Sequence, residues 1–435
     1  MTGASGRDVL VTGMGFCLPG ENEPVTTADD MWRVASTGRC CLTRNDEGVY
    51  YGTVGLTAGM FEQLVPDVPG VFAEHFTDAH RLGLVAMVAA CEDAGLDFRT
   101  DDLTEAGILA ARGGVDANIG SYLAMLRSDS ETIDLAAAAG IFVETALSLT
   151  PSDVALAQSA LVRSTGPCFT VSCGCSSSSV QINNARRMIA AGEVEIAVVT
   201  GVDTLSFDLL QRLFGLVEVV QQLDAADRPM PLPDEVLSFK RLMRPYDRRA
   251  HCVNYGEGAA TVILESREHA ERRSARPHGR VLAQAVVRDG LAHPLASDDS
   301  GAGLVSAVRK CLGQQWDLKQ VPYIHGGSDG GMATLESNAI RTLYGPAAAD
   351  LLMTSQEGCF GHNGAPTGSL GVALTLLMMQ HGEVCPTANC EEPLEDLPFD
   401  PVPGVTTRKL DFDHALTFTY QLGGLQSSIL LGRAD

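Results

Sequence analysis

Short apolar runs alternate with amphipathic segments along the whole chain. Apolar, β-prone runs predict strands at 8–13, 107–111, 195–202 and 255–265, together with the run that begins at Phe169. Helical spacing predicts helices at 32–38, 81–94 and 118–148. The second part repeats this rhythm, with strands at 280–287, 321–325, 415–421 and 427–432 and helices at 301–313, 333–343 and 370–380. Strands alternating with helices in both parts predict a doubly wound α/β architecture.

Two polar stretches interrupt this alternation. Residues 267–278 are charged and punctuated by proline, so we expect the chain to divide there into lobes at 1–265 and 266–435. Residues 215–243 carry three closely spaced prolines and predict an irregular surface excursion. The first strand is expected to stop at a turn formed by Gly13 and Gly15, and residues 355–369 are expected to form a loop.

Composition narrows the class of protein. A chain of 435 residues with 45% hydrophobic residues can bury a large core, and its net charge of −23 argues against a nucleic-acid surface. No apolar run reaches about 18 residues; the longest, Leu370 to Met379, fits a buried helix, so no membrane partner is expected. The 12 cysteines show no paired spacing typical of a disulfide framework. A reduced, cytoplasmic protein is predicted.

The strongest chemical signal is the stretch from Phe169 to Ile182. An apolar run tightens at Gly174 and continues with helical spacing, which predicts a strand, a sharp turn and a helix with Cys175 at the bend. A thiol at the positive end of a helix dipole favours the reactive thiolate. Nearby backbone N–H groups can stabilise an oxyanion. Cys173 is a rival nucleophile, but strand alternation favours a packed thiol there.

Six ordered landmarks resemble the β-ketoacyl synthases of the thiolase superfamily over nearly the whole length. They are Val11-Thr-Gly-Met-Gly, Cys175-Ser-Ser-Ser, Arg244-Pro-Tyr-Asp with Gly256-Glu-Gly-Ala, His325-Gly with Glu336, Gly361-His-Asn-Gly-Ala, and Gly423-Gly424. The resemblance implies a thiolase-like α/β fold, in which two related βαβαβ halves pack as five αβαβα layers. It also implies a homodimer, no bound cofactor, and an acyl substrate carried on the phosphopantetheine of an acyl or peptidyl carrier protein.

The resemblance also implies roles for individual residues. Cys175 would be the acyl-accepting nucleophile, and His325 and His362 would be paired imidazoles that polarise a thioester carbonyl and stabilise an enolate. The oxyanion would be bound by the backbone N–H groups of Cys175 and Leu422. A zinc site at Cys359 and His362 would lack two further ligands, so no metal is expected. The Gly-Met-Gly-Phe fragment lacks the third glycine of a dinucleotide loop.

The departures from the family pattern concern the substrate site. Family members commonly carry threonines that hold the phosphopantetheine arm, where this chain has Gly327 and Asp329. The terminal turn reads Gln421-Leu422, with Leu422 at the position of the family's gating phenylalanine. Five residues before the second histidine, the usual lysine is replaced by Glu357. These substitutions leave two interpretations of Glu357 open, a neutral change at a structural position and a functional charge reversal.

A carboxylate at position 357 would either raise the pKa of a neighbouring histidine or, if buried, act as a general base. It would also oppose a malonyl carboxylate. We therefore predict a ketosynthase-like cyclase that loads Cys175 and closes a ring by an aldol-type step, with lactonising release, as in γ-lactam-β-lactone formation. The alternatives are a decarboxylative synthase that extends an acyl chain, and an inactive partner subunit of a ketosynthase heterodimer.

Overall fold

The computed structural model describes residues 7–113, 153–204, 240–292 and 297–434, except positions 47, 67, 69–72, 74, 251 and 252. A few isolated positions between 127 and 139 are also described. The predicted helix at 118–148 and the predicted excursion at 215–243 therefore lie almost wholly outside the described residues.

The described strands form a mixed sheet whose order is β10-β9-β13-β14-β8-β1-β7-β6-β4-β5. The half of the sheet from the first lobe consists of β1 (Val9–Cys17), β4 (Gly107–Ala111), β5 (Cys168–Val171), β6 (Ile196–Asp203) and β7 (Gly258–Ser266). The other half consists of β8 (Gly279–Arg288), β9 (Tyr323–His325), β10 (Leu352–Thr354), β13 (His414–Gln421) and β14 (Leu425–Gly432).

Each half combines a parallel trio with antiparallel neighbours. Strands β5, β4 and β6 run parallel, as do β10, β9 and β13. Among the described strands, the half-sheets meet where β1 pairs with β8, through Leu10 with Arg280 and Val11 with Gly279. The predicted alternation of strands and helices is therefore confirmed, and a repeat is visible in the strand pairing itself.

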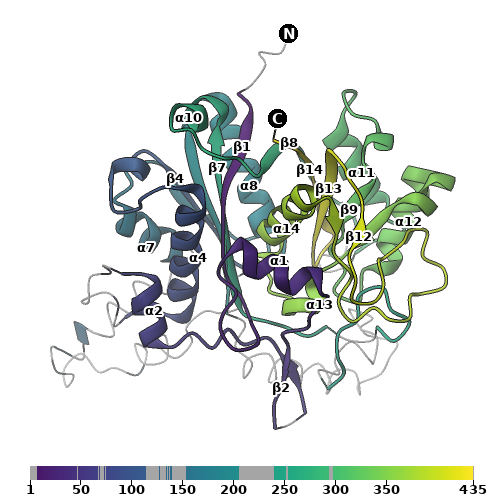
Figure 1. Cartoon of the computed structure of the whole chain (residues 1–435), viewed down its shortest axis with the longest axis horizontal. Helices are drawn as coiled ribbons and strands as arrows, with labels where there is room; N and C mark the ends of the chain where they lie inside the picture. Colours follow the sequence, from purple (N-terminus) through teal and green to yellow (C-terminus); the bar gives the residue numbers. More distant parts are fainter. Residues whose placement is uncertain are drawn as a thin grey trace.

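The helices lie on both faces of each half-sheet (Figure 1). Their bounds are α1 (Ala28–Ser36), α2 (Ala58–Leu64), α4 (Asp78–Ala94), α7 (Asp153–Val162), α8 (Ser177–Ala191), α10 (Arg267–Arg272), α11 (Ala302–Leu312), α12 (Ala333–Tyr344), α13 (Glu357–Phe360) and α14 (Thr367–His381). Short 3-10 turns cover Asp101–Leu103, Leu318–Gln320 and Gly345–Asp350. A small hairpin pairs Thr43–Arg44 with Tyr50–Tyr51, and a separate two-stranded sheet pairs Glu383–Val384 with Arg408–Lys409.

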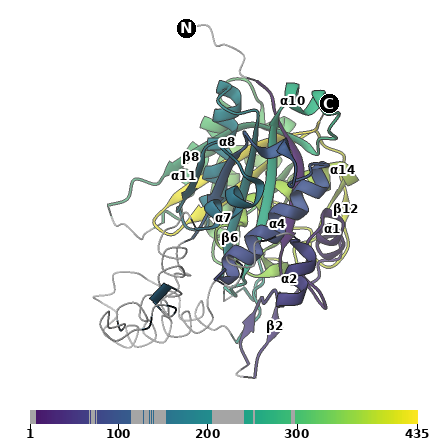
Figure 2. The ribbon, with the colours of Figure 1, turned by 90° about the vertical axis from the view of Figure 1, so that its left-hand side faces the viewer.

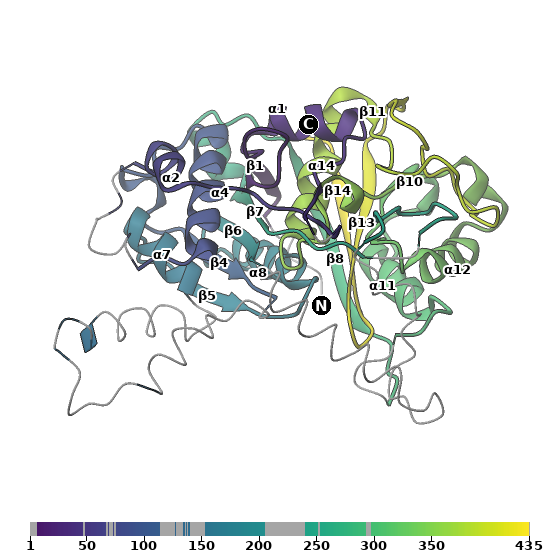
Figure 3. The same ribbon diagram turned by 90° about the horizontal axis from the view of Figure 1, so that it is seen from below.

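The layers are clearest from below, where α4 and α7 lie outside one half-sheet, α11 and α12 lie outside the other, and α8 and α14 lie between them (Figure 3). Figure 2 shows α2, α4 and α7 on the outer face of the first half. Three hydrophobic cores match these layers. One surrounds the central helices, and the other two lie beneath α4 and beneath α11 and α12. This is the thiolase-like five-layered arrangement.

The predicted turn at Gly13 and Gly15 is wrong, because β1 continues to Cys17. Both glycines face α4, and a Cβ at either position would collide with the backbone of Ala90. The glycines therefore let α4 pack directly onto the strand. The two glycines are therefore required by the close packing of β1 and α4, and they do not mark a reversal of the chain.

Two segments are more regular than the sequence suggested. The charged stretch 267–278 begins with α10, whose first turn is capped by Ser266 accepting from the N–H of His269. Within it, the Arg273 side chain bonds to Glu265 and to the carbonyl of Ala94. The predicted loop 355–369 contains α13 and the first residues of α14.

Candidate active site

The candidate catalytic residues lie at the carboxyl ends of strands from both halves. Strands β9, β10 and β13 are parallel, and His325 pairs with Thr354 on one side and Thr417 on the other. The segment that follows Thr354 therefore starts beside His325. Carboxyl ends of parallel strands are the usual position of ligand sites in α/β folds.

Cys175 lies in the predicted turn between β5 and α8. Gly174 has a φ of +52°, which favours glycine, and helix α8 begins two residues after Cys175 with Ser176 as its N-cap. The N–H of Cys173 donates to Ser177 Oγ at 2.8 Å, and Ser177 Oγ donates to the carbonyl of Gly174 at 2.6 Å. These bonds fix the loop that presents the thiol.

A continuous chain of side chains connects Cys175 to the unusual carboxylate. Cys175 Sγ lies 2.8 Å from His362 Nε2, and His362 Nδ1 lies 2.8 Å from Glu357 Oε2. The side chains of His362 and Glu357 are 11% and 8% exposed. The two imidazole nitrogens therefore face a thiol and a carboxylate, in the sulfur, imidazole and carboxyl order of a nucleophile, its base and an orienting group.

The pKa values of this chain of groups follow from burial and charge. Burial alone would lower the pKa of His362, but the neighbouring Cys175 and Glu357 raise it well above its ordinary value. Burial raises the pKa of Glu357, although the nearby His362 opposes this effect. Thr367 Oγ1 donates to Glu357 Oε1 at 3.4 Å. The imidazole therefore holds a proton readily between two acceptors.

His325 occupies a different environment. The side chain is buried, and burial lowers its pKa to about 4. The Tyr323 hydroxyl lies 3.5 Å from His325 Nδ1. At neutral pH this ring is therefore uncharged, which suits an N–H donor to a carbonyl or enolate oxygen. The two histidines have opposite pKa shifts because only His362 is flanked by groups that can carry negative charge.

The loop after His325 is held by a buried carboxyl group. Glu336 accepts hydrogen bonds from the Tyr246 hydroxyl at 2.7 Å, the Tyr420 hydroxyl at 2.8 Å and the Gly327 N–H at 2.9 Å. Burial raises the pKa of Glu336 to about 7. Glu336 was recognised from the sequence only as a landmark. Its tyrosine partners come from distant segments and gave no local signal.

The two positions that depart from the family's threonines have different surroundings. A Cβ at Gly327 would lie 2.9 Å from Tyr420 Cε2 and 3.0 Å from the carbonyl of Phe418, so Tyr420 fills the space of a side chain there. Asp329 is half-buried, and its Oδ1 accepts from the Gly331 N–H at 3.0 Å. Its charge adds to burial in raising the pKa of Glu357. The site is therefore rich in carboxylates.

The turn between β13 and β14 lies against the nucleophile loop. A Cβ at Gly174 would lie 2.8 Å from Gln421 Cγ, so Gln421 covers the turn that precedes Cys175. Leu422, the next residue, is 60% exposed. Gln421 therefore lies against the turn that precedes Cys175, and the adjoining Leu422 contributes an exposed apolar side chain; the oxyanion role of Leu422 and the substrate-binding roles of both residues stay predictions.

Sequence reasoning missed a residue that positions the histidine loop. The buried Asp203, the last residue of β6, accepts hydrogen bonds from the N–H groups of Gly113 and Ala365, each at 2.7 Å. It connects strands of the first half to the segment after His362. Tyr255 packs edge-on against the His362 ring at a centroid distance of 5.9 Å. The only available signal was an acid that closes an otherwise apolar strand.

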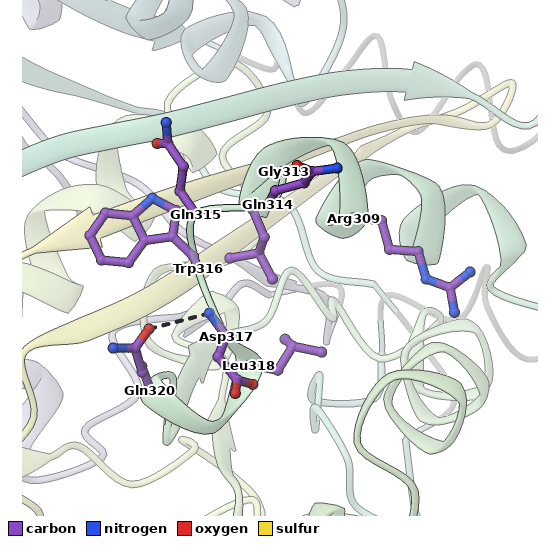
Figure 4. A pocket seen from close by; sticks show the side chains of 9 residues that line it. Arg309, Gly313, Gln314, Gln315, Trp316, Asp317, Leu318 and Gln320 are labelled. Carbon is purple, nitrogen blue, oxygen red and sulfur yellow. Dashed lines mark hydrogen bonds between the residues drawn. The ribbon is translucent and has the colours of Figure 1, made fainter. Parts of the chain in front are cut away.

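Among the described residues, no group of three or more His, Cys, Asp or Glu side chains is arranged to hold a metal ion. Within the same part of the chain, no helix combines the length and apolarity needed to cross a membrane. A surface hollow of about 620 Å3 lies where α11 ends, and Arg309, Gln314, Trp316 and Asp317 line it (Figure 4). It contains none of the candidate catalytic residues.

Comparison with known proteins gives matches over most of the chain. The family model described as the beta-ketoacyl synthase N-terminal domain matches residues 6–270, and the model of the corresponding C-terminal domain matches residues 278–391. A 3-oxoacyl-[acyl-carrier-protein] synthase 2 from Vibrio harveyi is 24% identical over 438 residues and covers 98% of both chains. An oxytetracycline polyketide beta-ketoacyl synthase 1 from Streptomyces rimosus is 26% identical over 440 residues, covering 98% of this chain and 97% of the relative.

Solved structures confirm the fold. A type II polyketide ketosynthase, bound to a hexaketide and in complex with its acyl-carrier protein, superposes with a TM-score of 0.77 at 19% identity. The match covers 99% of this chain and 100% of that structure. At this level of identity the similarity concerns the fold alone.

Proposed function

The chain belongs to the β-ketoacyl synthase family, and we propose that this ketosynthase-type enzyme forms a C–C bond within one carrier-delivered acyl chain, without decarboxylating malonyl. The observation that carries the proposal is the chain of contacts from Cys175 through His362 to Glu357, with 2.8 Å at each step. It places a carboxylate behind the base, where the family commonly has a lysine.

The first half-reaction needs only Cys175 and His362. The sulfur attacks the carbonyl carbon of the carrier thioester while its proton passes to His362 Nε2. The tetrahedral oxyanion collapses, the bond to the carrier sulfur breaks, and that sulfur takes the proton from His362. Glu357 stabilises the intermediate imidazolium through Nδ1. The acyl group is then a thioester of Cys175.

The second half-reaction uses the same pair as a base. His362, with Glu357 accepting through Nδ1, removes a proton from the carbon next to the thioester carbonyl. The enolate attacks a carbonyl carbon further along the same chain and produces an alkoxide. That alkoxide attacks the thioester, the bond to Cys175 breaks, and the sulfur recovers the proton. A lactone leaves with no net loss of atoms.

The charges of the site favour this course over chain extension. Glu357 and Asp329 bring two carboxyl groups to the region around His362. A malonyl carboxylate entering there would meet like charge. Gly327 offers no hydroxyl to a carrier arm, and Tyr420 occupies the adjoining space. A substrate already attached to Cys175 does not depend on binding of a carrier arm at this position.

We propose an acyl or peptidyl carrier protein as the donor and a second copy of this chain as the oligomeric partner. Strand β5 forms one edge of the sheet, and all four of its residues are half-buried in the single chain, including the apolar Cys168, Phe169 and Val171. Such an edge is suited to pairing with an identical strand.

The decisive experiment offers the protein an acyl carrier and a carbon-labelled malonyl carrier, and follows the mass of the Cys175 adduct. We expect an acyl adduct, ring closure and no incorporation of label. Label in a 3-ketoacyl product would overturn the cyclase proposal. In Glu357→Gln we expect acylation to persist while closure falls by about a hundredfold or more. Glu357→Asp, which keeps the carboxylate, is the matched control.

A decarboxylative synthase is the second candidate, favoured by the names of the relatives and by the presence of Cys175, His325 and His362 together. Glu357→Lys tests it, because a gain of malonyl decarboxylation would show that only this residue separates the two chemistries. An inactive heterodimer subunit is disfavoured by the thiol placed 2.8 Å from His362. Failure of Cys175 to react with any thioester would favour that role.

A further inference from the structure

The turn between β13 and β14 carries one of the two predicted oxyanion donors, the N–H of Leu422. The Gly424 N–H donates to the carbonyl of Gln421 at 3.1 Å and closes this turn. Gly423 and Gly424 have φ angles of +93° and +78°, which favour glycine. Among the described residues, the Leu422 N–H has no backbone acceptor. It can stabilise an oxyanion only if the turn holds it within about 2.7–3.1 Å of the oxygen.

The turn is held at both ends. Gln421 at its start covers Gly174 of the nucleophile loop, and Gly424 at its end lies against Asp289, the residue that follows β8. The Asp289 N–H donates to the carbonyl of Gly424 at 2.9 Å. A Cβ at Gly424 would lie 2.4 Å from Asp289 Oδ2 and 2.8 Å from its Cγ. The backbone and the carboxyl group of Asp289 therefore both contact the end of the turn.

The Asp289 carboxylate is itself fixed by three other parts of the chain. Its Oδ2 accepts from the Asp298 N–H at 2.7 Å, and its Oδ1 accepts from the side-chain amide of Gln426 in β14. A Cβ at Gly303, in the first turn of α11, would lie 2.1 Å from Oδ1. The positive end of that helix dipole favours a carboxylate there. Asp289 is therefore a fixed point against which the turn is placed.

We propose that Asp289 is a positioning residue for the oxyanion site, because it fixes the turn that presents the Leu422 N–H to the nucleophile loop. This inference rests on the loading half-reaction of the proposed function and is independent of the ring-forming step. When the Cys175 sulfur attacks the carrier thioester, the carbonyl oxygen gains negative charge and accepts from the Leu422 N–H. Asp289 does not touch the substrate and acts only through the backbone of the turn.

Two reactions of Cys175 distinguish this role from a general effect on the fold. Attack on a thioester places negative charge on a carbonyl oxygen, which needs the oxyanion donors. Alkylation by iodoacetamide displaces iodide from a saturated carbon atom and creates no oxyanion. Both reactions use the same sulfur beside His362. A change in their ratio therefore reports on the oxyanion site, whereas a disturbed nucleophile loop would slow both.

The test measures both reactions in Asp289→Asn by mass spectrometry of Cys175, with N-acetylcysteamine thioesters from acetyl to decanoyl as acyl donors. The amide presents a donor where Asp298 and Gln426 each need an acceptor, so one of these two bonds must break. We expect acylation to slow by about tenfold or more, and alkylation to stay within about twofold of the wild-type rate. Asp298→Asn is the matched control, because it keeps the backbone N–H that Asp289 accepts; both rates should be unchanged.

A second variant, Gln426→Met, removes the amide donor to Asp289 with a side chain of similar size, and it should slow acylation selectively as well. Equal slowing of acylation and alkylation, or no slowing of either, would overturn the role of Asp289. Selective slowing in an enzyme that incorporates malonyl label would retain this role and reject the cyclase proposal, since loading precedes both chemistries. A wild type that none of the thioesters acylates would reject the loading step and this role with it.

Discussion

At the residue scale, one substitution changes the character of the site. Glu357 replaces the family's usual lysine, and its carboxylate lies 2.8 Å from His362. Since a lysine would repel a protonated imidazole and a carboxylate attracts it, the exchange reverses the sign of the influence on that ring. His325, buried without such a neighbour, keeps a lowered pKa of about 4. His362 therefore favours its protonated form, whereas His325 is a neutral N–H donor.

The effect of Glu357 on His362 can be measured directly. In a Cys175→Ala background, which removes the sulfur from both proteins, Glu357→Gln should lower the pKa of His362 by about one pH unit or more. The carboxylate favours the imidazolium, so its loss makes the ring release its proton at lower pH. NMR titration of the ring nitrogens reports the change. An unaltered midpoint would mean that the carboxyl group is not ionised beside the ring.

A second prediction concerns the pH dependence of stability. The pKa of folded His325 is about 4, below the 6.5 of an exposed histidine. Between these values the unfolded chain binds a proton that the folded protein does not, so stability falls as pH drops from 6.5 to 4. The loss amounts to about 3 kcal/mol. Urea unfolding across this range should show a smaller loss for His325→Asn than for the wild type.

At the element scale, glycines set how closely helices approach their strands and each other. Gly13 and Gly15 admit α4 onto β1, and a Cβ at Gly368 of α14 would lie 2.5 Å from the backbone nitrogen of Ser179 in α8. The helix that follows Cys175 and the helix that follows His362 therefore touch almost backbone to backbone. The distance between nucleophile and base depends on this contact.

Gly15→Ala tests the first of these contacts. The added methyl group would collide with the Ala90 backbone, which cannot move without displacing α4, so we expect a loss of about 3 kcal/mol in the free energy of unfolding. Gly59→Ala is the control, since no atom lies within 4 Å of a Cβ there and the residue is helical. That variant should be unchanged or more stable by about 0.5–1 kcal/mol. Equal effects would contradict the packing argument.

Elements with strong periodicity were predictable, and those defined by tertiary contact were not. Helix α11 was predicted to within one residue at each end, and strand β7 to within three, because their local apolar pattern determines their secondary structure. Strand β10 has only three residues and is fixed by pairing with β9, which no local pattern reveals. The glycines of β1 were wrongly predicted to form a turn for the same reason. The residue that they pack against, Ala90 of α4, lies about 75 residues away in the sequence.

The site was predictable where a residue type carries its own chemistry. Cys175, His325, His362 and Glu357 were named from the sequence, and the structure brings Cys175, His362 and Glu357 into contact. Their roles remain predictions. Asp203 and Tyr420 could not be identified, because Asp203 acts through backbone N–H groups and Tyr420 through the distant side chain of Glu336, contacts that exist only after folding.

At the scale of the whole molecule, the site is assembled from both halves. Cys175 comes from the first, whereas His325, Glu357 and His362 come from the second. Asp203 of the first half holds the loop of the second through the N–H of Ala365. Within the described strands, the sheet joins the halves through two residue pairs between β1 and β8. The joint therefore depends on packing around α8 and α14.

Asp203→Asn tests this joint. The amide keeps one acceptor oxygen but presents a donor to the second backbone N–H, so one of the two 2.7 Å bonds must break. We expect a loss of about 1–3 kcal/mol in stability and a slower reaction of Cys175 with iodoacetamide, because His362 loses its fixed position. Asp317→Asn, at an exposed helix cap, is the control. Normal thiol reactivity in Asp203→Asn would mean that the Asp203–Ala365 contact between the halves does not position His362 for catalysis.

The narrow pairing between β1 and β8 bears on how chains of this kind diversify. Genetic exchange near residue 278 would deliver a new sulfur-bearing half to an old pair of imidazoles, and the crossover would disturb few strand contacts. A hybrid gene would inherit its loading specificity from one parent and its proton chemistry, including the acid at 357, from the other. Ring-forming and chain-extending descendants would then arise by recombination of existing halves, without new mutations within either half.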